Sequence, residues 1–213
     1  MELIVYALLL LTSVVGLAFI IERAFALRWR RVVPAEIEAA VESCQSPEDV
    51  PMLRRVCQQH DSAMSRLLLL IADHLHWPMA ETVGAVQTRA RHEIARLERG
   101  LVVLEIIVGI APLLGLVGTI IGMIAVFADV GNSGLNDAAK LAQGISYILR
   151  ATLAGLLIAI PSLIFWSYYS KKVETLAVEM ETLCDEFIRR QYRHEIHGPK
   201  ARVQRREPEA TIG

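Results

Sequence analysis

Residues 111–124 read APLLGLVGTIIGMI, an apolar run that contains one proline, three glycines and one threonine. The run lies inside 23 uncharged residues, 106–128, and about 20 apolar residues suffice to cross a hydrocarbon core of about 30 Å. Glycine and proline weaken an isolated helix, so their presence here needs a packing or functional reason. On a helix the small residues follow one another at steps of three and four and form one narrow stripe: Gly115, Gly118, Thr119 and Gly122.

Two further segments are long enough to span a bilayer. Residues 3–21 carry no charge, and residues 145–169 are interrupted only by Arg150 before Lys171 and Lys172. Mean hydropathy is +0.40 although 21% of the residues are charged, which is typical of a chain that lies partly in a membrane and partly in water. The sequence therefore predicts an all-α integral membrane protein with three transmembrane helices.

Basic residues beside the spans predict its orientation, because Lys and Arg concentrate on the cytoplasmic side. They follow the first span, precede the second and follow the third: Arg23, Arg28, Arg30 and Arg31; Arg89, Arg91, Arg96 and Arg99; Lys171 and Lys172. We expect the N-terminus outside and the C-terminus in the cytoplasm. Glu2 precedes the first apolar run and no basic residue does, which favours an uncleaved anchor over a signal peptide.

The sequence predicts six segments. Residues 79–100 lead into the second span without a proline, and apolar residues recur at helical spacing after the third, so helices 2 and 3 should extend into a helical cytoplasmic domain. The segments are transmembrane helix 1 at 1–27, a cytoplasmic helical loop at 28–100, transmembrane helix 2 at 101–128, an outer loop at 129–144, transmembrane helix 3 at 145–170, and a cytoplasmic helical tail at 171–213 with a disordered end from Gly198.

The third span repeats the small-residue stripe of the second, with Thr152, Gly155, Ala159 and Ser162. Thr119 lies nine residues and Thr152 seven residues from the outer ends of their spans, which is roughly 10 to 14 Å deep for both. Pro112 and Pro161 also match each other in depth. Small residues allow close helix packing in lipid, so tight packing of spans two and three is one interpretation. A polar girdle that oligomerisation multiplies into a ring is the other.

The middle of each span contains no Asp, Glu, His or Lys. A proton relay through a membrane needs a group that gains and loses a proton, and a hydroxyl does not do so near neutral pH. If protons cross the membrane here, another chain must supply the titrating group.

Three stretches carry a resemblance: IERAFALRWRRVVP at 21–34, ERGLVVLEIIVGIAPLLGLVGTIIGMIAVF at 98–127, and LAQGISYILRATLAGLLIAIPSLIFWSYY at 141–169. They resemble the MotA/TolQ/ExbB proton-channel family, and most closely its ExbB and TolQ branch. The likeness covers all three spans, and the PLLGL-GT-IGM motif is far more specific than a bare GxxxG.

The resemblance implies a proton-channel or stator subunit of an energy-transducing motor. Such a motor couples the proton motive force to outer-membrane transport or envelope maintenance. The resemblance further implies a multi-pass protein of the bacterial inner membrane, with its N-terminus in the periplasm. It also implies a homo-oligomer, a pentameric ring, around an ExbD- or TolR-like single-span protein with a membrane aspartate. A TonB- or TolA-like protein is a further expected partner.

The resemblance also implies roles for residues. Thr119 and Thr152 match the threonines that face the partner aspartates along the ion pathway. Pro112, Gly115, Gly118 and Gly155 match the inner wall of the ring, and the stripes add further packing positions at Gly122, Ala159 and Pro161.

Three residues are candidate polar groups at the pore mouth or an interface: Glu105, Tyr147 and Arg150. Tyr147 stands where many family members carry an acidic residue, and Arg150 where an apolar residue is usual. Arg150 is five residues from the outer end of its span, so snorkelling or an intersubunit pair is favoured over a gating role.

Other function classes have less support. The chain shows no paired carboxylates, nucleophile elbow or phosphate loop, so we expect no enzyme, and a net charge of −1 gives no reason to expect nucleic acid. A non-conducting oligomeric membrane scaffold is the alternative function, and Tyr147 is its best support. We expect no cofactor, metal site or disulfide, because these histidines and cysteines lack suitable spacing: His74, His76, His194, His197, Cys44, Cys57 and Cys184.

Overall fold

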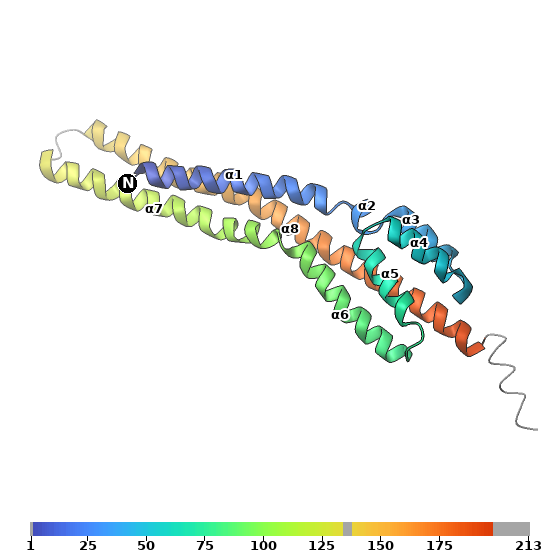
Figure 1. Cartoon of the computed structure of the whole chain (residues 1–213). Coiled ribbons are helices and arrows are strands. Elements are labelled where there is room, and N and C mark those ends of the chain that lie inside the picture. Colours follow the sequence, from blue (N-terminus) through green and yellow to red (C-terminus); the bar gives the residue numbers. More distant parts are fainter. Residues whose placement is uncertain (1, 134–137, 198–213) are drawn as a thin grey trace, which may run out of the picture. The chain divides into compact units, whose positions relative to one another are not determined.

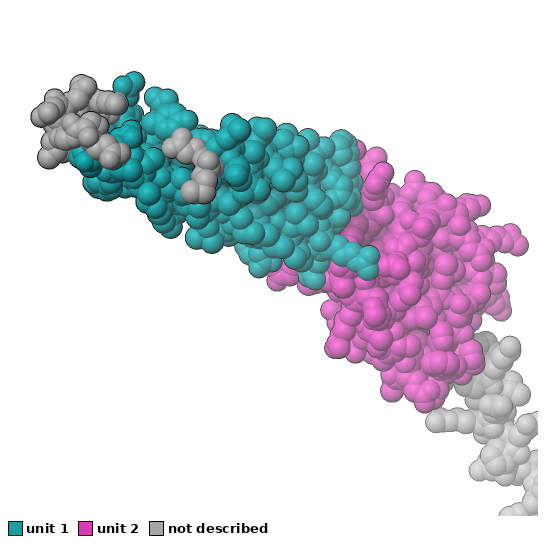
Figure 2. All heavy atoms as spheres, turned by 60° about the vertical axis from the view of Figure 1, so that its left-hand side comes forward, with its two compact units in different colours: residues 1–26, 98–171 teal, residues 27–97, 172–213 magenta. Residues whose placement is uncertain are grey.

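The computed structural model describes residues 2–133 and 138–197, which form helices and, within these ranges, no strand (Figure 1). The chain divides into two compact units, coloured separately in Figure 2. Unit 1 comprises Met1–Ala26 and Glu98–Lys171, and unit 2 comprises Leu27–Leu97 and Lys172–Gly213.

Unit 1 is built from α1 (Glu2–Ala26), α7 (Leu101–Ser133) and the first part of α8 (Ala138–His197). Each of these helices contains a stretch long and apolar enough to cross a membrane. Much of their surface is exposed and apolar, as contact with lipid requires; examples are Leu10, Leu113, Ile120, Phe127, Leu153 and Ile164. The predicted all-α fold with three membrane-length helices is confirmed.

The three helices of unit 1 lie side by side (Figure 1). A Cβ atom on Gly16 of α1 would lie 3.5 Å from Ile107 Cδ1 of α7 and 3.5 Å from Ser162 Oγ of α8. Nearer its C-terminal end, α1 accepts a hydrogen bond of 3.0 Å at the Ile20 carbonyl from the Tyr169 hydroxyl of α8. These contacts bring all three spans into one packed group.

The helix boundaries differ from the sequence prediction at two places. Residues 79–100 were expected to run without interruption into the second span, but α6 (Met79–Glu98) ends before Arg99 and Gly100, and α7 begins at Leu101. Gly100 is buried, and the Arg23 side chain lies where a Cβ would be placed there, so a larger residue at the break would require that side chain to move. The outer loop expected at 129–144 is shorter, because α7 and α8 extend into it. Residues 134–137 and the tail from Gly198 lie outside the described residues.

Unit 2 contains six short or medium helices and the second part of α8. In chain order they are α2 (Trp29–Val32), α3 (Ala35–Ser43), the 3₁₀ helix η1 (Pro47–Asp49), α4 (Val50–Gln59), α5 (Ala63–His74) and α6. Side chains cap two of them: Ser46 and Asp49 form a capping box at η1, and the Ser65 amide donates to Ser62 Oγ at α5. The helices enclose a core of fully buried apolar side chains: Leu53, Leu67, Leu68, Ile71, Leu176 and Phe187.

A buried carboxylate ties α5 to α6 inside unit 2. The Glu93 side chain is 1% exposed, and it lies 2.7 Å from Arg66 Nη2, 3.2 Å from Arg89 Nη2 and 3.7 Å from Arg96 Nη1. Burial by itself raises the pKa of Glu93, but the hydrogen bond and charge of Arg66, followed by the charges of Arg89 and Arg96, hold that pKa below its ordinary value. The carboxylate is therefore ionised and paired in the folded unit.

A hydroxyl cluster joins the α5–α6 turn to the end of α8. The Tyr192 hydroxyl donates to the Trp77 carbonyl at 2.7 Å and lies 2.8 Å from Thr82 Oγ1. Thr82 Oγ1 in turn donates to the His74 carbonyl at 3.0 Å. Because Tyr192 and Thr82 are both buried, these bonds satisfy polar atoms that water does not reach.

Candidate functional site

The candidate site lies where α7 and α8 cross in unit 1, and glycines make the crossing close. A Cβ on Gly155 would lie 2.5 Å from the Ala111 carbonyl oxygen and 3.2 Å from the Gly115 Cα. A Cβ on Gly115 would lie 2.9 Å from the Ala151 carbonyl oxygen and 3.0 Å from the Thr152 Cα. The two backbones therefore touch, and a side chain at either glycine would force them apart. Such packing holds helices together in lipid, where the burial of apolar surface does not favour helix association.

The stripe continues along α7 in both directions. A Cβ on Gly118 would lie 2.8 Å from Ala151 Cβ of α8 and 3.2 Å from Val5 Cγ1 of α1, and one on Gly122 would lie 2.7 Å from Ile148 Cγ1. Toward the other end of the crossing, Ala159 packs with Ile107 and Ala111 in a small buried cluster. The small residues of the stripe thus contact neighbouring helices of the same chain.

The two threonines lie beside the same turn of α7. Thr152 is half-buried on α8, and its Oγ1 lies 3.5 Å from the Gly115 carbonyl oxygen of α7, a long hydrogen bond between the two helices. In a helix the carbonyl of Gly115 faces the amide of residue 119. Thr119 is half-buried, and its Oγ1 donates to the Leu116 carbonyl of its own helix at 2.6 Å. The structure therefore brings both hydroxyls to the turn between Gly115 and Thr119.

Both prolines lie inside continuous helices, Pro112 half-buried in α7 and Pro161 exposed in α8. A proline donates no backbone hydrogen bond, so the carbonyl four residues earlier in each helix lacks its usual partner. In α7 that carbonyl belongs to Val108, one turn before the crossing.

The three candidate polar groups lie differently. Glu105 and Arg150 are exposed, and neither makes an ion pair within residues 2–133 and 138–197. Tyr147 is 47% exposed, and its ring centroid lies 6.3 Å from that of Tyr6 on α1. With Gly118 and Gly122, these two tyrosines line a void of about 10 Å³. Tyr6 was not among the predicted site residues, because a single tyrosine within the first apolar run does not indicate a site.

The chemistry of the crossing is that of hydroxyl and carbonyl groups. Hydroxyls donate and accept hydrogen bonds, but they do not titrate near neutral pH. The crossing can therefore orient water or an acid, but its own hydroxyl and carbonyl groups do not carry a proton.

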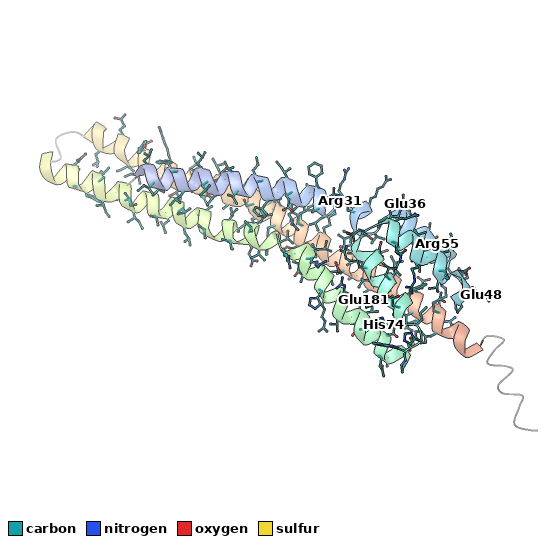
Figure 3. The ribbon with its side chains drawn as sticks, viewed as in Figure 1. Arg31, Glu36, Glu48, Arg55, His74 and Glu181 are labelled. Carbon is teal, nitrogen blue, oxygen red and sulfur yellow. The ribbon has the colours of Figure 1, made fainter. Side chains whose placement is uncertain are left out.

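The histidines and cysteines that were considered for metal binding have other surroundings in unit 2. His74 is labelled at the end of α5 in Figure 3. Its Nδ1 lies 2.7 Å from the Leu70 carbonyl, and its ring packs edge-on against Trp77 at a centroid distance of 4.1 Å. Cys44, Cys57 and Cys184 are buried free thiols. Within the described residues, His, Cys, Asp and Glu form no group of three that could hold a metal ion. The side chains of His194 and His197 lie outside the described residues.

The sequence of this chain is similar to those of a known protein family. A sequence model of the MotA/TolQ/ExbB proton channel family matches residues 60–182, which include the entire crossing. A Synechocystis sp. protein named ExbB-like 1 is 32% identical over 200 residues, which cover 90% of this chain and 77% of that protein.

Two proteins named biopolymer transport protein ExbB are similar over shorter stretches. The Helicobacter pylori protein is 40% identical over 81 residues, 38% of this chain and 56% of that protein. The Aquifex aeolicus protein is 30% identical over 90 residues, 42% of this chain and 61% of that protein. In both cases the match spans less than two thirds of the relative. Together with the family match, these likenesses show that the chain belongs to the MotA/TolQ/ExbB proton channel family, within its ExbB branch.

Proposed function

We propose that this chain is the stator subunit that lines the proton path of an energy-transducing motor in the bacterial inner membrane. Its family supports a proton-channel role in energy transduction. The observation that carries the finer proposal is the pair of threonine hydroxyls, Thr119 and Thr152, at one turn of α7. They lie in spans whose middles contain no titratable carboxylate, lysine or histidine of their own.

The proton is carried by an aspartate on a single-span partner of the ExbD or TolR kind. A carboxylate that leaves water for the membrane interior favours its protonated form. A hydroxyl accepts a hydrogen bond from the protonated acid and donates one to the carboxylate, so Thr152 and Thr119 serve both states. The aspartate can then load from one side of the membrane and unload to the other while it faces the same pair of hydroxyls.

The crossing is repeated by oligomerisation. Several copies of this chain, in a pentameric ring, surround the partner helices and present one threonine pair per copy. The glycines of the stripe keep α7 and α8 together as one wall of the ring. The N-terminus of the chain faces the periplasm, and its C-terminus faces the cytoplasm. Proton flow turns ring and partner relative to each other, and a TonB- or TolA-like protein transmits the work to outer-membrane transport or envelope maintenance.

The test is proton flux into liposomes that contain the chain and a single-span, aspartate-bearing protein of the ExbD or TolR kind. Thr152→Val keeps the shape of the side chain and removes the hydroxyl, so flux should stop while native mass spectrometry still shows the intact complex. Thr152→Ser should retain flux. Thr12→Val is the matched control, because Thr12 of α1 donates only to the Leu9 carbonyl of its own helix. Unchanged flux in Thr152→Val would refute the proposed pathway.

The non-conducting scaffold remains the second candidate, because Tyr147 stands where the family resemblance implies an acidic residue. Native mass spectrometry of the complex purified gently from its own membranes separates the two functions. A ring that encloses a single-span, aspartate-bearing protein supports the stator. A ring without such a protein, together with liposomes that conduct no protons, supports the scaffold.

A further inference from the structure

Three arginines gather directly after α1, and none is neutralised. The side chains of Arg28, Arg30 and Arg31 are all exposed, and within the described ranges 2–133 and 138–197 none of them makes an ion pair. Arg23 gives the contrast: its side chain is 11% exposed and lies 2.8 Å from Glu22. The three later arginines therefore present unpaired positive charge on one short segment of unit 2.

The fold of unit 2 holds these arginines on its outside. Leu27 and Val33 are 0% exposed and Val32 is 2% exposed, so the apolar residues around α2 are buried while the arginines beside them are exposed. The Arg31 amide donates to the Arg28 carbonyl at 2.9 Å and closes the turn between them. Figure 3 labels Arg31 on α2. Because the buried side chains fix this turn, the arginines do not fold inward.

Chain length places this turn near the bilayer surface. The uncharged part of α1 ends at Ile21 and the helix ends at Ala26, which adds about 7 Å along its axis. Two further residues to Arg28 add at most about 7 Å, and the helical turn to Arg31 adds about 6 Å. The headgroup layer covers roughly 5 to 7 Å of this path. The rest of the distance from the headgroup layer to Arg31 is covered by the length of the arginine side chain and a Debye length of about 10 Å.

We propose that Arg28, Arg30 and Arg31 form a docking site for anionic phospholipid headgroups, which they bind through the lipid phosphates. Arginine presents a planar fork of donors that matches a phosphate bidentately. A basic cluster directly beside a span is attracted to an anionic leaflet, and the attraction falls off within a Debye length. The occupant is the bilayer that α1 already crosses, so no other partner is needed, and the site does not depend on the proposed proton path.

Lipid titration of the full-length, delipidated chain, followed by native mass spectrometry, tests the site. The probes are dioleoyl phosphatidylglycerol and dioleoyl phosphatidylcholine, and the measured quantity is the ratio of their affinities. Arg30→Gln/Arg31→Gln should lower this ratio by about five- to thirtyfold at low salt. Arg30→Lys/Arg31→Lys, which keeps the charge, should retain most of it. Arg55→Gln/Arg193→Gln is the matched control, because both side chains are exposed and lie more than 20 residues from the nearest span.

The outcomes separate this site from general charge effects. A preference for phosphatidylglycerol that falls in Arg30→Gln/Arg31→Gln, stays in the control and weakens at higher ionic strength supports the proposal. An unchanged ratio, or an equal fall in the control, overturns it. Displacement of phosphatidylglycerol by inorganic phosphate at equal concentration would also overturn it, because the cluster would then bind free anions rather than lipid. Affinity for phosphatidylcholine reports on the fold of each variant, since it involves no net headgroup charge.

Discussion

Replacement of Gly155 by alanine adds one methyl group at the point where α7 and α8 are closest. The new Cβ would lie 2.5 Å from the Ala111 carbonyl oxygen, whereas ordinary van der Waals contact begins at 3.4 Å. The two backbones would have to separate by the difference, and both atoms next to the methyl group belong to main chain, which cannot rotate away. Overpacking of this kind costs about 1 to 3 kcal/mol.

Gly109→Ala is the matched control. Gly109 also lies in α7, but a Cβ there would meet nothing within 4 Å. Both substitutions gain the same helix propensity, about 1 kcal/mol, because alanine restricts the unfolded chain more than glycine. The difference between the two variants therefore isolates the packing cost, and we expect Gly155→Ala to be less stable than Gly109→Ala by about 1 to 3 kcal/mol.

The assay is reversible unfolding of the purified chain by SDS in mixed micelles. Circular dichroism measures the helix content at each SDS fraction. Gly109→Ala should unfold at the same or a higher SDS fraction than the unsubstituted chain, and Gly155→Ala at a lower SDS fraction than Gly109→Ala. Equal midpoints for the two variants would refute the close crossing, because they would show that α7 and α8 have room for a methyl group at Gly155.

Three further predictions concern unit 2. Tyr192→Phe removes the bond to the Trp77 carbonyl and should lower the free energy of unfolding by about 1 to 3 kcal/mol; an unchanged denaturation midpoint would contradict the hydroxyl cluster. Because the pKa of Glu93 is held below its ordinary value, its stabilising effect is complete above about pH 4.3 and is lost as the pH falls through the folded-state value. Glu93→Gln should therefore lose less stability between about pH 5 and pH 3 than the unsubstituted chain, and equal losses would disprove the pairing. Burial raises the pKa of Cys57 to about 11, so iodoacetamide at about pH 8 should modify it roughly two hundredfold more slowly than an exposed thiol; mass spectrometry of the labelled peptide would reveal a faster reaction.

The membrane-length helices could be predicted from the sequence because hydropathy is a local property of each segment. The run at 106–128 is apolar whatever it packs against, and the steps of three and four residues fix which small side chains share a face. The partner of that face is not a local property. The contacts of Gly118 with Val5 and of Gly122 with Ile148 depend on how three distant segments meet, and a single sequence does not encode such contacts as a pattern.

The features that the sequence analysis did not identify are also those set by distant contacts. Glu93 lies among charged residues of α6, a pattern typical of a solvated helix face, yet its side chain is 1% exposed and pairs with Arg66, 27 residues away. The break between α6 and α7 falls at Gly100, and the Arg23 side chain that lies beside it comes from a distant segment of the chain. The sequence shows that such residues are charged or small. The residues that they contact are visible only in the folded structure.

The packing of the crossing and the proposed proton transfer depend on different residues, so mutations can test them separately. The Thr152 hydroxyl lies 3.5 Å from the Gly115 carbonyl oxygen, at the long limit of a hydrogen bond, so its loss should cost the fold less than the usual net value of about 1 kcal/mol. Valine fills the same volume, and the backbone contact at Gly155 persists. A loss of flux in Thr152→Val without a loss of stability would therefore report the chemistry of the hydroxyl. A loss of both in Gly155→Ala would report the wall that holds it.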